Sequence, residues 1–383
     1  MTDGTELATS RRLASGLRVF FVAYHAPPHD ARFLKLRRSF IGAGAVVGAA
    51  APSLGPLAEG VTPVDPGPAS TGRWSAFLRA RRITQGILRA GGAFRPELIY
   101  VFDPEALPAA LALKRRSGAR LLYDAHEFHE AEDPSAPERG AWVRKTERAA
   151  SAEIDAFVTV NASIARLYAE AQPTLAKAIV VRNAVEAGRV APYDGRLHEA
   201  SGAPRERRLL LYQGGLAKMR GLDRLVAAAP LLGPDWMLVI MGDGPLGPSL
   251  KAAADPARVR FMPPVPHIDL PAWTSGASLG AVLYEDIGLN QHFCSPNKLW
   301  EYPHAGVPLL ASDLPELARV ARGLGCGVLV PPDAPPATIA AAVNDLKDAD
   351  LARARAACAA FSASETWESE IAPALDFAQR LRP

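Results

Sequence analysis

The sequence has 383 residues, of which 49% are hydrophobic and 22% charged; this balance is typical of a globular chain and excludes an intrinsically disordered one. The length favours two domains, because a domain usually takes about 100–200 residues. The 43 basic residues nearly balance the 40 acidic ones, and the net charge of +3 is too weak to indicate nucleic acid as the main partner, so we expect no nucleic-acid partner and any anion site must be local.

The first segment and the cysteines indicate the compartment. Residues 1–17 are polar and lack the apolar core of a signal peptide. No uncharged apolar run reaches the length of about 18 residues that a membrane span needs. The three cysteines are widely spaced and form no metal-ligand pattern, which is typical of reduced thiols. We therefore expect a cytoplasmic protein, either soluble or peripheral at the inner face of the cytoplasmic membrane.

Short apolar runs recur through the first half of the chain, with helix-length stretches between them. These runs are Leu17–Ala23, Ala45–Ala50, Leu98–Phe102, Arg120–Tyr123 and Ala156–Val160. Short apolar runs bounded by turn residues predict buried parallel strands of an α/β domain. We assign this domain to residues 1–190 and interpret the polar stretch at 191–208 as a linker between domains.

The same rhythm restarts after this stretch. The expected strands are Leu209–Tyr212, Met237–Met241, Val259–Met262, Leu279–Leu283, Val307–Ala311 and Gly327–Val330. They predict a second doubly wound α/β domain over residues 209–363. Residues 364–383 are expected to form a helix that returns to the first domain. Because ligands of open parallel sheets bind at the carboxyl ends of the strands, two such sheets predict a cleft fed by loops from both domains.

Two glycine turns follow strands of the second domain. Gly214 and Gly215 end its first strand and precede Arg220, and Gly242 and Gly244 belong to a Gly-Asp-Gly-Pro turn after its second strand. Glycine lets backbone N–H groups approach a diphosphate, and a nearby cation neutralises the ligand. Short glycine motifs also occur in ordinary strand-to-helix turns. Each turn taken alone therefore leaves both interpretations open.

The segment Ser295–Pro308, with sequence SPNKLWEYPHAGVP, is more informative. It predicts a helix capped by Ser295 and begun by the following proline, with free N–H groups and Lys298 available to an anion. Glu301 lies four residues after Asn297 on the same helix face, where a carboxylate can accept hydrogen bonds from the two hydroxyls of a ribose. The alternative is a capped helix that packs its apolar residues into the core and leaves its charges in solvent.

In this order, with ASDLPE after them, these motifs resemble the retaining glycosyltransferases of family 4, and the branch with SPNK is the closer match. The resemblance extends over about residues 17–370 and includes Pro27–Arg32, Tyr123–Glu127 and Ile154–Val160. It implies the GT-B arrangement, in which two Rossmann-like domains face each other across a cleft. It also implies a nucleotide-sugar donor bound by the C-terminal domain.

The resemblance assigns Arg220 to the donor diphosphate, Glu301 to the nucleotide ribose and His126 to the donor sugar and acceptor. Because sugar transfer leaves negative charge on the departing diphosphate, catalysis is expected mainly from cations aimed at it. We expect His126, Arg220 and Lys298 to be catalytic. The other residues expected to bind the donor are Gly214, Gly215, Gly242, Gly244, Ser295, Asn297 and Glu301.

On the acceptor side we expect Asp30, Arg32 and Glu127, although an ion pair within the loop would explain the first two equally well. The chain departs from the family at two places. Phe293 stands where the family often has its first glutamate, and Gly215 where a second basic residue is often found. We expect Lys298 to supply part of the missing charge. No metal-clamp pattern is present, so neither a metal nor another cofactor is expected.

The expected function is transfer of a sugar from a nucleotide-sugar donor to a glycan or lipid-linked acceptor, with retention of configuration, in cell-surface polysaccharide or glycoconjugate synthesis. A sugar-nucleotide epimerase or hydrolase is the enzymatic alternative, because fold does not fix reaction. A non-catalytic nucleotide-sugar-binding partner protein is the other, motivated by Phe293 and Gly215. A dehydrogenase is disfavoured because His25–Pro28, after the first strand, lacks the glycine fingerprint.

The segment Arg73–Arg89 predicts a helix with five arginines. Trp74, Phe77, Leu78 and Ile87 are its large apolar residues near one side. Aromatic and basic residues on one helix are typical of an interfacial anchor, so contact with an anionic membrane is one expectation. The alternative is an ordinary amphipathic helix that packs these apolar residues onto its sheet.

Overall fold

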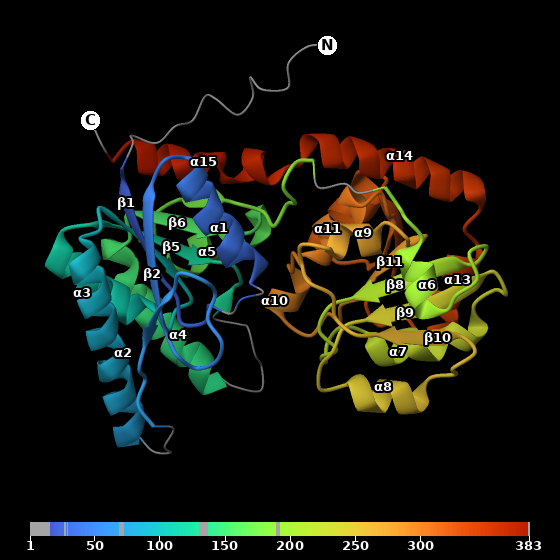
Figure 1. Ribbon diagram of the computed structural model, residues 1–383, viewed down its shortest axis with the longest axis horizontal. Helices are drawn as coiled ribbons and strands as arrows, with labels where there is room; N and C mark the ends of the chain where they lie inside the picture. The colour runs from blue at the N-terminus through green and yellow to red at the C-terminus, as the bar shows by residue number, and fades with distance from the viewer. Residues whose placement is uncertain are drawn as a thin grey trace, which may run out of the picture. The chain divides into compact units, whose positions relative to one another are not determined.

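The computed structural model describes residues 16–26, 28, 30–68, 73–129, 137–188 and 192–381. The expectation of no signal peptide concerns residues 1–17, and most of these lie outside the described part. Pro27 and His29 of the first N-terminal motif also lie outside it. The chain divides into two compact units. The first comprises Met1–Arg182 and Glu368–Pro383, and the second comprises Asn183–Trp367 (Figure 1).

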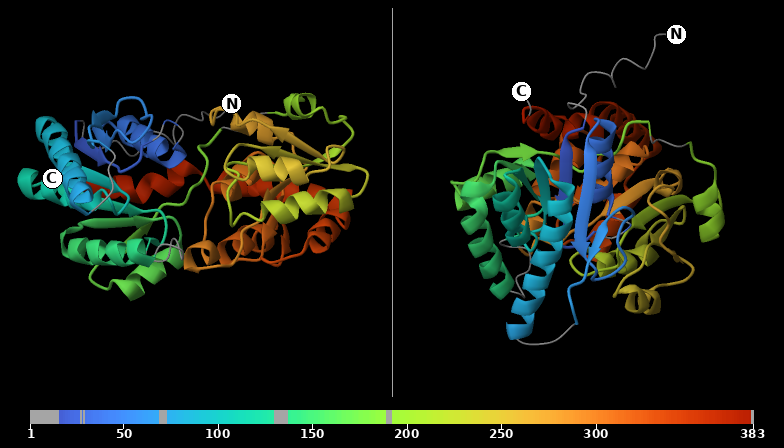
Figure 2. Two further views of the ribbon diagram at one scale, coloured as in Figure 1. Left: turned by 90° about the horizontal axis from the view of Figure 1, so that it is seen from below. Right: turned by 60° about the vertical axis from the view of Figure 1, so that its left-hand side comes forward.

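The first unit contains a parallel sheet with strand order β3-β2-β1-β4-β5-β6-β7. Its strands are β1 (Arg18–Val22), β2 (Val46–Pro52), β3 (Thr62–Val64), β4 (Leu98–Phe102), β5 (Arg120–Ala125), β6 (Ala156–Thr159) and β7 (Ala178–Val180). The helices are α1 (Ala31–Gly42), α2 (Arg73–Phe94), α3 (Leu107–Ser117), α4 (Pro137–Ala150), the 3₁₀ helix η2 (Ser151–Glu153) and α5 (Ala162–Ala171). Figure 2 shows helices on both faces of this sheet.

The second unit contains a parallel sheet with strand order β10-β9-β8-β11-β12-β13. Its strands are β8 (Arg208–Gln213), β9 (Trp236–Met241), β10 (Val259–Met262), β11 (Leu279–Val282), β12 (Leu309–Ser312) and β13 (Gly327–Val330). The first helices are α6 (Arg196–Ser201), α7 (Leu222–Ala228), the 3₁₀ helix η3 (Ala229–Leu231), α8 (Gly247–Ala253), α9 (Leu270–Thr274) and α10 (Leu289–His292). Then follow α11 (Lys298–His304), α12 (Pro315–Ala318), the π-helical turn η4 (Arg319–Gly323), α13 (Pro336–Asn344) and α14 (Asp348–Ser364). The last helix, α15 (Trp367–Gln379), belongs to the first unit from Glu368 onward.

Burial of continuous apolar runs explains why these segments form strands. Every residue of β4 and of β9 is buried, as expected for strands covered on both faces. Every strand expected from the sequence is present, within two residues at each end. The short edge strands β3 and β7 were not expected, because each has only three residues.

Strand order reverses between β1 and β4 in the first sheet and between β8 and β11 in the second. Ligands of open parallel sheets bind outside the carboxyl ends of the strands at such a reversal. Ligand-binding residues are therefore expected in the loops that follow β4 in the first unit and β8 in the second.

The expected linker at 191–208 is wrong for the part that the structure describes. Residues 196–201 form α6, and Leu197 is fully buried in the core of the second unit, which begins at Asn183. Residues from Glu368 onward belong to the first unit. Glu370 of α15 accepts hydrogen bonds from the backbone N–H and the Nε of Arg182, each at 3.0 Å.

Candidate functional site

The two glycine turns of the second unit are joined to each other. The Leu216 N–H donates to the carbonyl of Asp243 at 2.7 Å. A Cβ added to Gly242 would lie 2.0 Å from the Gly214 carbonyl oxygen, and one added to Gly244 would lie 2.6 Å from that of Leu216. Both residues also have a φ of +148°, which favours glycine. Close packing between the two turns is therefore sufficient to explain Gly242 and Gly244.

Lys298, the first residue of α11, is buried with 7% of its surface exposed. Its Nζ lies 4.9 Å from the ring centroid of Tyr212 and 5.9 Å from that of Tyr284. It would lie 3.3 Å from a Cβ placed on Gly214, so it sits beside the glycine pair. Within the described chain, the ammonium forms no hydrogen bond or ion pair. A buried cation in this state is a ready partner for an anion.

The pKa of Lys298 reflects this environment. Burial lowers it first, and the nearby charge of Arg220 lowers it further, to about 8 from the usual 10.5, against the opposing effect of Glu301. Arg220 follows the glycine pair, and its Nη1 donates to the carbonyl of Gly215 at 2.8 Å. Two cations from distant parts of the sequence therefore converge at the carboxyl end of β8.

Glu301 is held inside the second unit, which excludes the alternative that leaves it in solvent. Its side chain is 15% exposed. The Gln213 side chain donates to Oε2 at 2.8 Å, and Nε2 of His267 lies 3.5 Å from Oε1. Burial raises the pKa of Glu301, but His267, Gln213 and the charge of Lys298 together outweigh burial and leave it below its usual value. Glu301 is therefore an oriented carboxylate.

The expected cap of the SPNK helix is wrong. The helix begins at Lys298, and Asn297, in helical conformation, stands at its N-cap position without a side-chain cap bond. Ser295 lies outside the first turn, and its hydroxyl accepts instead from the indole Nε1 of Trp300 at 3.4 Å. Asn297 is exposed, whereas Glu301 turns inward. Lys298 and Glu301, rather than a capped helix end, therefore supply the charges on α11.

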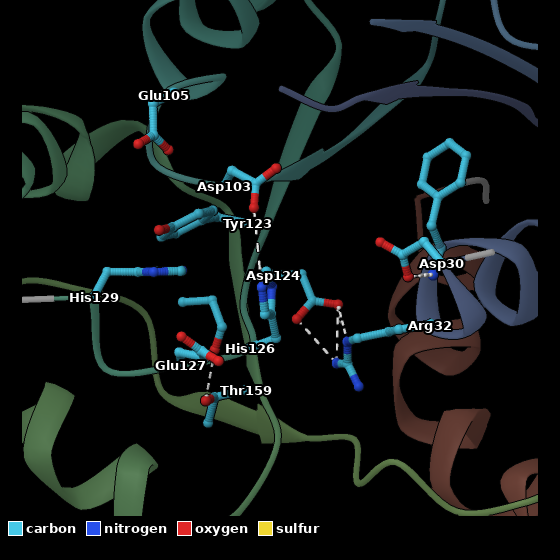
Figure 3. Close-up of polar contacts among 12 residues, drawn as sticks. Asp30, Arg32, Asp103, Glu105, Tyr123, Asp124, His126, Glu127, His129 and Thr159 are labelled. Atoms are coloured by element: carbon cyan, nitrogen blue, oxygen red, sulfur yellow. Dashed lines mark hydrogen bonds and ion pairs between the residues drawn. The ribbon is translucent and has the colours of Figure 1, made fainter. Parts of the chain in front are cut away.

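His126 follows β5 in the first unit, and Figure 3 shows it pointing toward Asp103. Its Nε2 lies 3.9 Å from Oδ1 of Asp103, and its ring meets His129 edge-on at 5.3 Å between centroids. Among the described residues, its Nδ1 has no hydrogen-bond partner. Asp103, at the end of β4, has a φ of +62°, a strained conformation that concentrates at functional sites. Our sequence reasoning missed Asp103, although it directly follows a predicted strand.

The expected acceptor-side residues have structural contacts. Oδ1 of Asp30 accepts from the Phe33 N–H at 3.0 Å and so caps α1. Arg32 is 8% exposed and forms a bidentate ion pair with Asp124 (Figure 3). Nη2 of Arg32 donates to Oδ1 at 2.9 Å, and Nε donates to Oδ2 at 3.1 Å. This pairing corrects the expectation that Arg32 is available to an acceptor, and it replaces the expected pair within the loop. Glu127 lies in the bend after β5, partly exposed.

Sequence family models agree with this architecture. Residues 5–184 match the model described as a glycosyl transferase 4-like domain, and residues 207–348 match the model for glycosyl transferases group 1. The two matches cover the two halves of the chain, which is therefore a glycosyltransferase with one domain of each kind. The sequence has no significant match among curated proteins.

Solved structures of glycosyltransferases show that the chain has the GT-B fold. Sucrose-phosphate synthase from Thermosynechococcus elongatus is similar with a TM-score of 0.75 and 16% identity, over 95% of this chain and 99% of that one. Anabaena Alr3699/HepE in complex with UDP-glucose gives 0.70 and 16%, over 94% and 99%. WaaG, a glycosyltransferase involved in lipopolysaccharide biosynthesis, gives 0.70 and 13%, over 94% and 99%.

Proposed function

We propose that the protein transfers a sugar from a nucleotide-sugar donor to a glycan or lipid-linked acceptor, with retention of anomeric configuration, in cell-surface polysaccharide or glycoconjugate synthesis. The buried ammonium of Lys298, without an anionic hydrogen-bond partner in the described chain and beside Arg220, carries this proposal. The complex of the similar HepE structure with UDP-glucose supports a nucleotide-sugar donor. Retention rests on the resemblance to family 4.

The reaction breaks the bond between the anomeric carbon and the diphosphate oxygen, which keeps the electron pair. Arg220 and Lys298 would stabilise this developing charge, and fixed cations in a dry site are effective at that task. Glu301 would hold the ribose. The acceptor oxygen then bonds to the anomeric carbon on the face the diphosphate leaves, and its proton passes to the departing phosphate oxygen.

The proposed reaction requires no metal, because the two cations can neutralise the diphosphate. Among the described residues, no cluster of three or more His, Cys, Asp or Glu side chains could hold a metal ion. Turnover that is unchanged after treatment with a chelator would support this part of the proposal, and turnover restored only by a divalent cation would contradict it.

A donor screen tests the function. Thermal shifts with UDP, GDP, ADP and TDP sugars identify the donor, because a ligand of the folded state raises its stability. Turnover of that donor is then measured with and without acceptors extracted from cells. Transfer only in the presence of an acceptor supports the proposal. Consumption of the donor alone would favour the epimerase or hydrolase, and tight binding without any transfer would favour the non-catalytic partner protein.

We also propose peripheral contact with an anionic membrane at the cytoplasmic face, through the start of α2. Trp74, Phe77 and Leu78 are 81%, 59% and 54% exposed, whereas Ile83 and Ile87 are buried. Figures 1 and 2 show these first turns extending beyond the sheet of their unit. The sheet-packing alternative therefore accounts only for the later turns. In the described part of the chain, no helix is long and apolar enough to cross a membrane.

The segment Arg73–Arg89, which begins with the exposed Trp74, Phe77 and Leu78, also contains five arginines. We therefore expect it to bind an anionic lipid surface more tightly than a neutral one. Co-sedimentation with anionic vesicles tests the contact. Binding should fall at high salt and in the variant Trp74→Ala with Phe77→Ala. The matched control is Trp142→Ala, since Trp142 is 42% exposed on α4 of the same unit. Absence of binding at low salt, or equal loss in both variants, would contradict the proposal.

A further inference from the structure

A chain of polar side chains extends behind Glu301, formed by residues that no motif singled out. Gln213 is the last residue of β8 and is 2% exposed, and Thr274 is the last residue of α9 and is 1% exposed. The Thr274 hydroxyl lies 2.8 Å from Oε1 of Gln213, whose Nε2 donates to Oε2 of Glu301 at 2.8 Å. Three elements distant in sequence thus meet in one line of hydrogen bonds.

The carboxylate fixes the direction of this line. An ionised carboxylate only accepts hydrogen bonds, so Gln213 must present its amide N–H₂ to Glu301 and its oxygen to Thr274. Thr274 must then donate its proton toward Gln213, although the same hydroxyl also lies 2.8 Å from the carbonyl of Leu270. When it donates to Oε1, the Thr274 hydroxyl supports the orientation of the Gln213 amide that the Glu301 carboxylate requires.

The two carboxylate oxygens are held from different sides. Gln213 contacts Oε2, and His267 faces Oε1 at 3.5 Å. A carboxylate has about four lone-pair sites, so two remain for a ligand while the group cannot rotate freely. A carboxylate fixed in this way can accept from a pair of neighbouring hydroxyls with little further loss of conformational freedom.

We propose that Gln213 and Thr274 are positioning residues that hold Glu301 for a ribose, and that they set the preference of this site for ribonucleoside over deoxyribonucleoside diphosphates. The inference rests on the proposed function and adds the determinant of sugar recognition within the nucleotide. Neither side chain needs to contact the ligand. Their effect is carried by the orientation of the Glu301 carboxylate.

The test compares Thr274→Val, which removes the hydroxyl and keeps the branched shape, with Thr274→Ser, which keeps the hydroxyl. Gln213→Leu serves as a second disrupting variant. The probes are UDP, GDP and ADP, each beside its 2′-deoxy and 3′-deoxy forms, and the readout is the ratio of the deoxy to the ribo dissociation constant. Inorganic pyrophosphate is the control ligand, since it engages the two cations and not Glu301.

The wild-type ratio should be roughly 10-fold to 100-fold, as expected for a hydrogen bond to a charged group. The ratio should fall by about fivefold or more in Thr274→Val and Gln213→Leu, and it should stay near the wild-type value in Thr274→Ser. The affinity for pyrophosphate should be unchanged in all three variants. If Gln213→Leu does not fold, the two Thr274 variants decide the question. A wild-type ratio in folded Thr274→Val overturns the inference alone, whereas a wild-type protein that binds no ribonucleoside diphosphate overturns the proposed function as well.

Discussion

Replacing Lys298 by methionine should stabilise the unliganded protein and weaken donor binding at once. The pKa of Lys298 is lowered from 10.5 to about 8 by burial and by Arg220. At about 1.4 kcal/mol per pH unit, keeping this lysine charged at pH 7 costs on the order of 3 kcal/mol of folding free energy. Methionine has a similar length and no charge, so most of this cost should disappear. For a domain of this size the melting temperature should rise by about 5–10 °C.

The sign of the pH dependence follows from the direction of the pKa change. Because the folded pKa lies below the unfolded one, the cost is complete below pH 8 and fades between pH 8 and 10.5. The stability advantage of Lys298→Met should therefore be largest at pH 7 and small at pH 10.5. Donor binding has the opposite requirement, since a diphosphate prefers the ammonium. Affinity of the wild-type protein should be level below pH 7 and fall above pH 8, by up to about tenfold per pH unit.

Calorimetry at pH 7 and 10 measures the stability difference, and nucleotide titrations from pH 6.5 to 9.5 measure the binding. Lys298→Arg is the matched control, because a guanidinium stays charged throughout this range. It should bind the donor without the fall above pH 8, even if its larger head group lowers the affinity overall. A Lys298→Met protein that is less stable at pH 7, or a wild-type affinity independent of pH, would refute the reasoning.

Three further outcomes are expected. Arg220→Ala should weaken nucleotide binding by roughly tenfold or more, the loss typical of a charge-assisted contact. Isothermal titration measures this, and unchanged affinity for every nucleotide would contradict the assignment of Arg220 to the diphosphate. Glu301→Gln should reduce nucleotide affinity and turnover with little change in melting temperature, and a large drop in melting temperature with normal affinity would indicate a purely structural residue. Asp124→Asn should destabilise the protein by about 3–5 kcal/mol, because it leaves Arg32 buried without its counter-charge; chemical denaturation measures this, and a loss of turnover at full stability would instead support a role for Arg32 in acceptor binding.

The strands could be predicted because buried parallel strands are continuous apolar runs that are readable locally. The charged residues Arg220, Lys298 and Glu301 stood in recognisable motifs, and in the structure the charges of Arg220 and Glu301 both act on Lys298. The capping role of Ser295 could not be judged from the sequence, because it depended on the residue at which the helix begins and on whether the indole of Trp300 would contact the hydroxyl.

The supporting residues of the site were beyond local reasoning. Gln213 and Glu301 are 88 residues apart, and Gln213 and Thr274 are 61 apart. A buried glutamine next to a glycine pair carries no signal of its partner until the topology is known. Asp103 is a milder case, since its place after a predicted strand could have marked it, but its backbone conformation is not visible in the sequence.

The divided first unit has a consequence for synthesis of the chain. Arg182 binds Glu370, 188 residues later in the sequence, and the whole second unit is made in between. At translation rates of about 5–20 residues per second, the sheet of the first unit waits roughly 10–40 s for α15. The second unit, which is continuous, can finish folding first. The domain whose synthesis begins first is therefore the last to be completed.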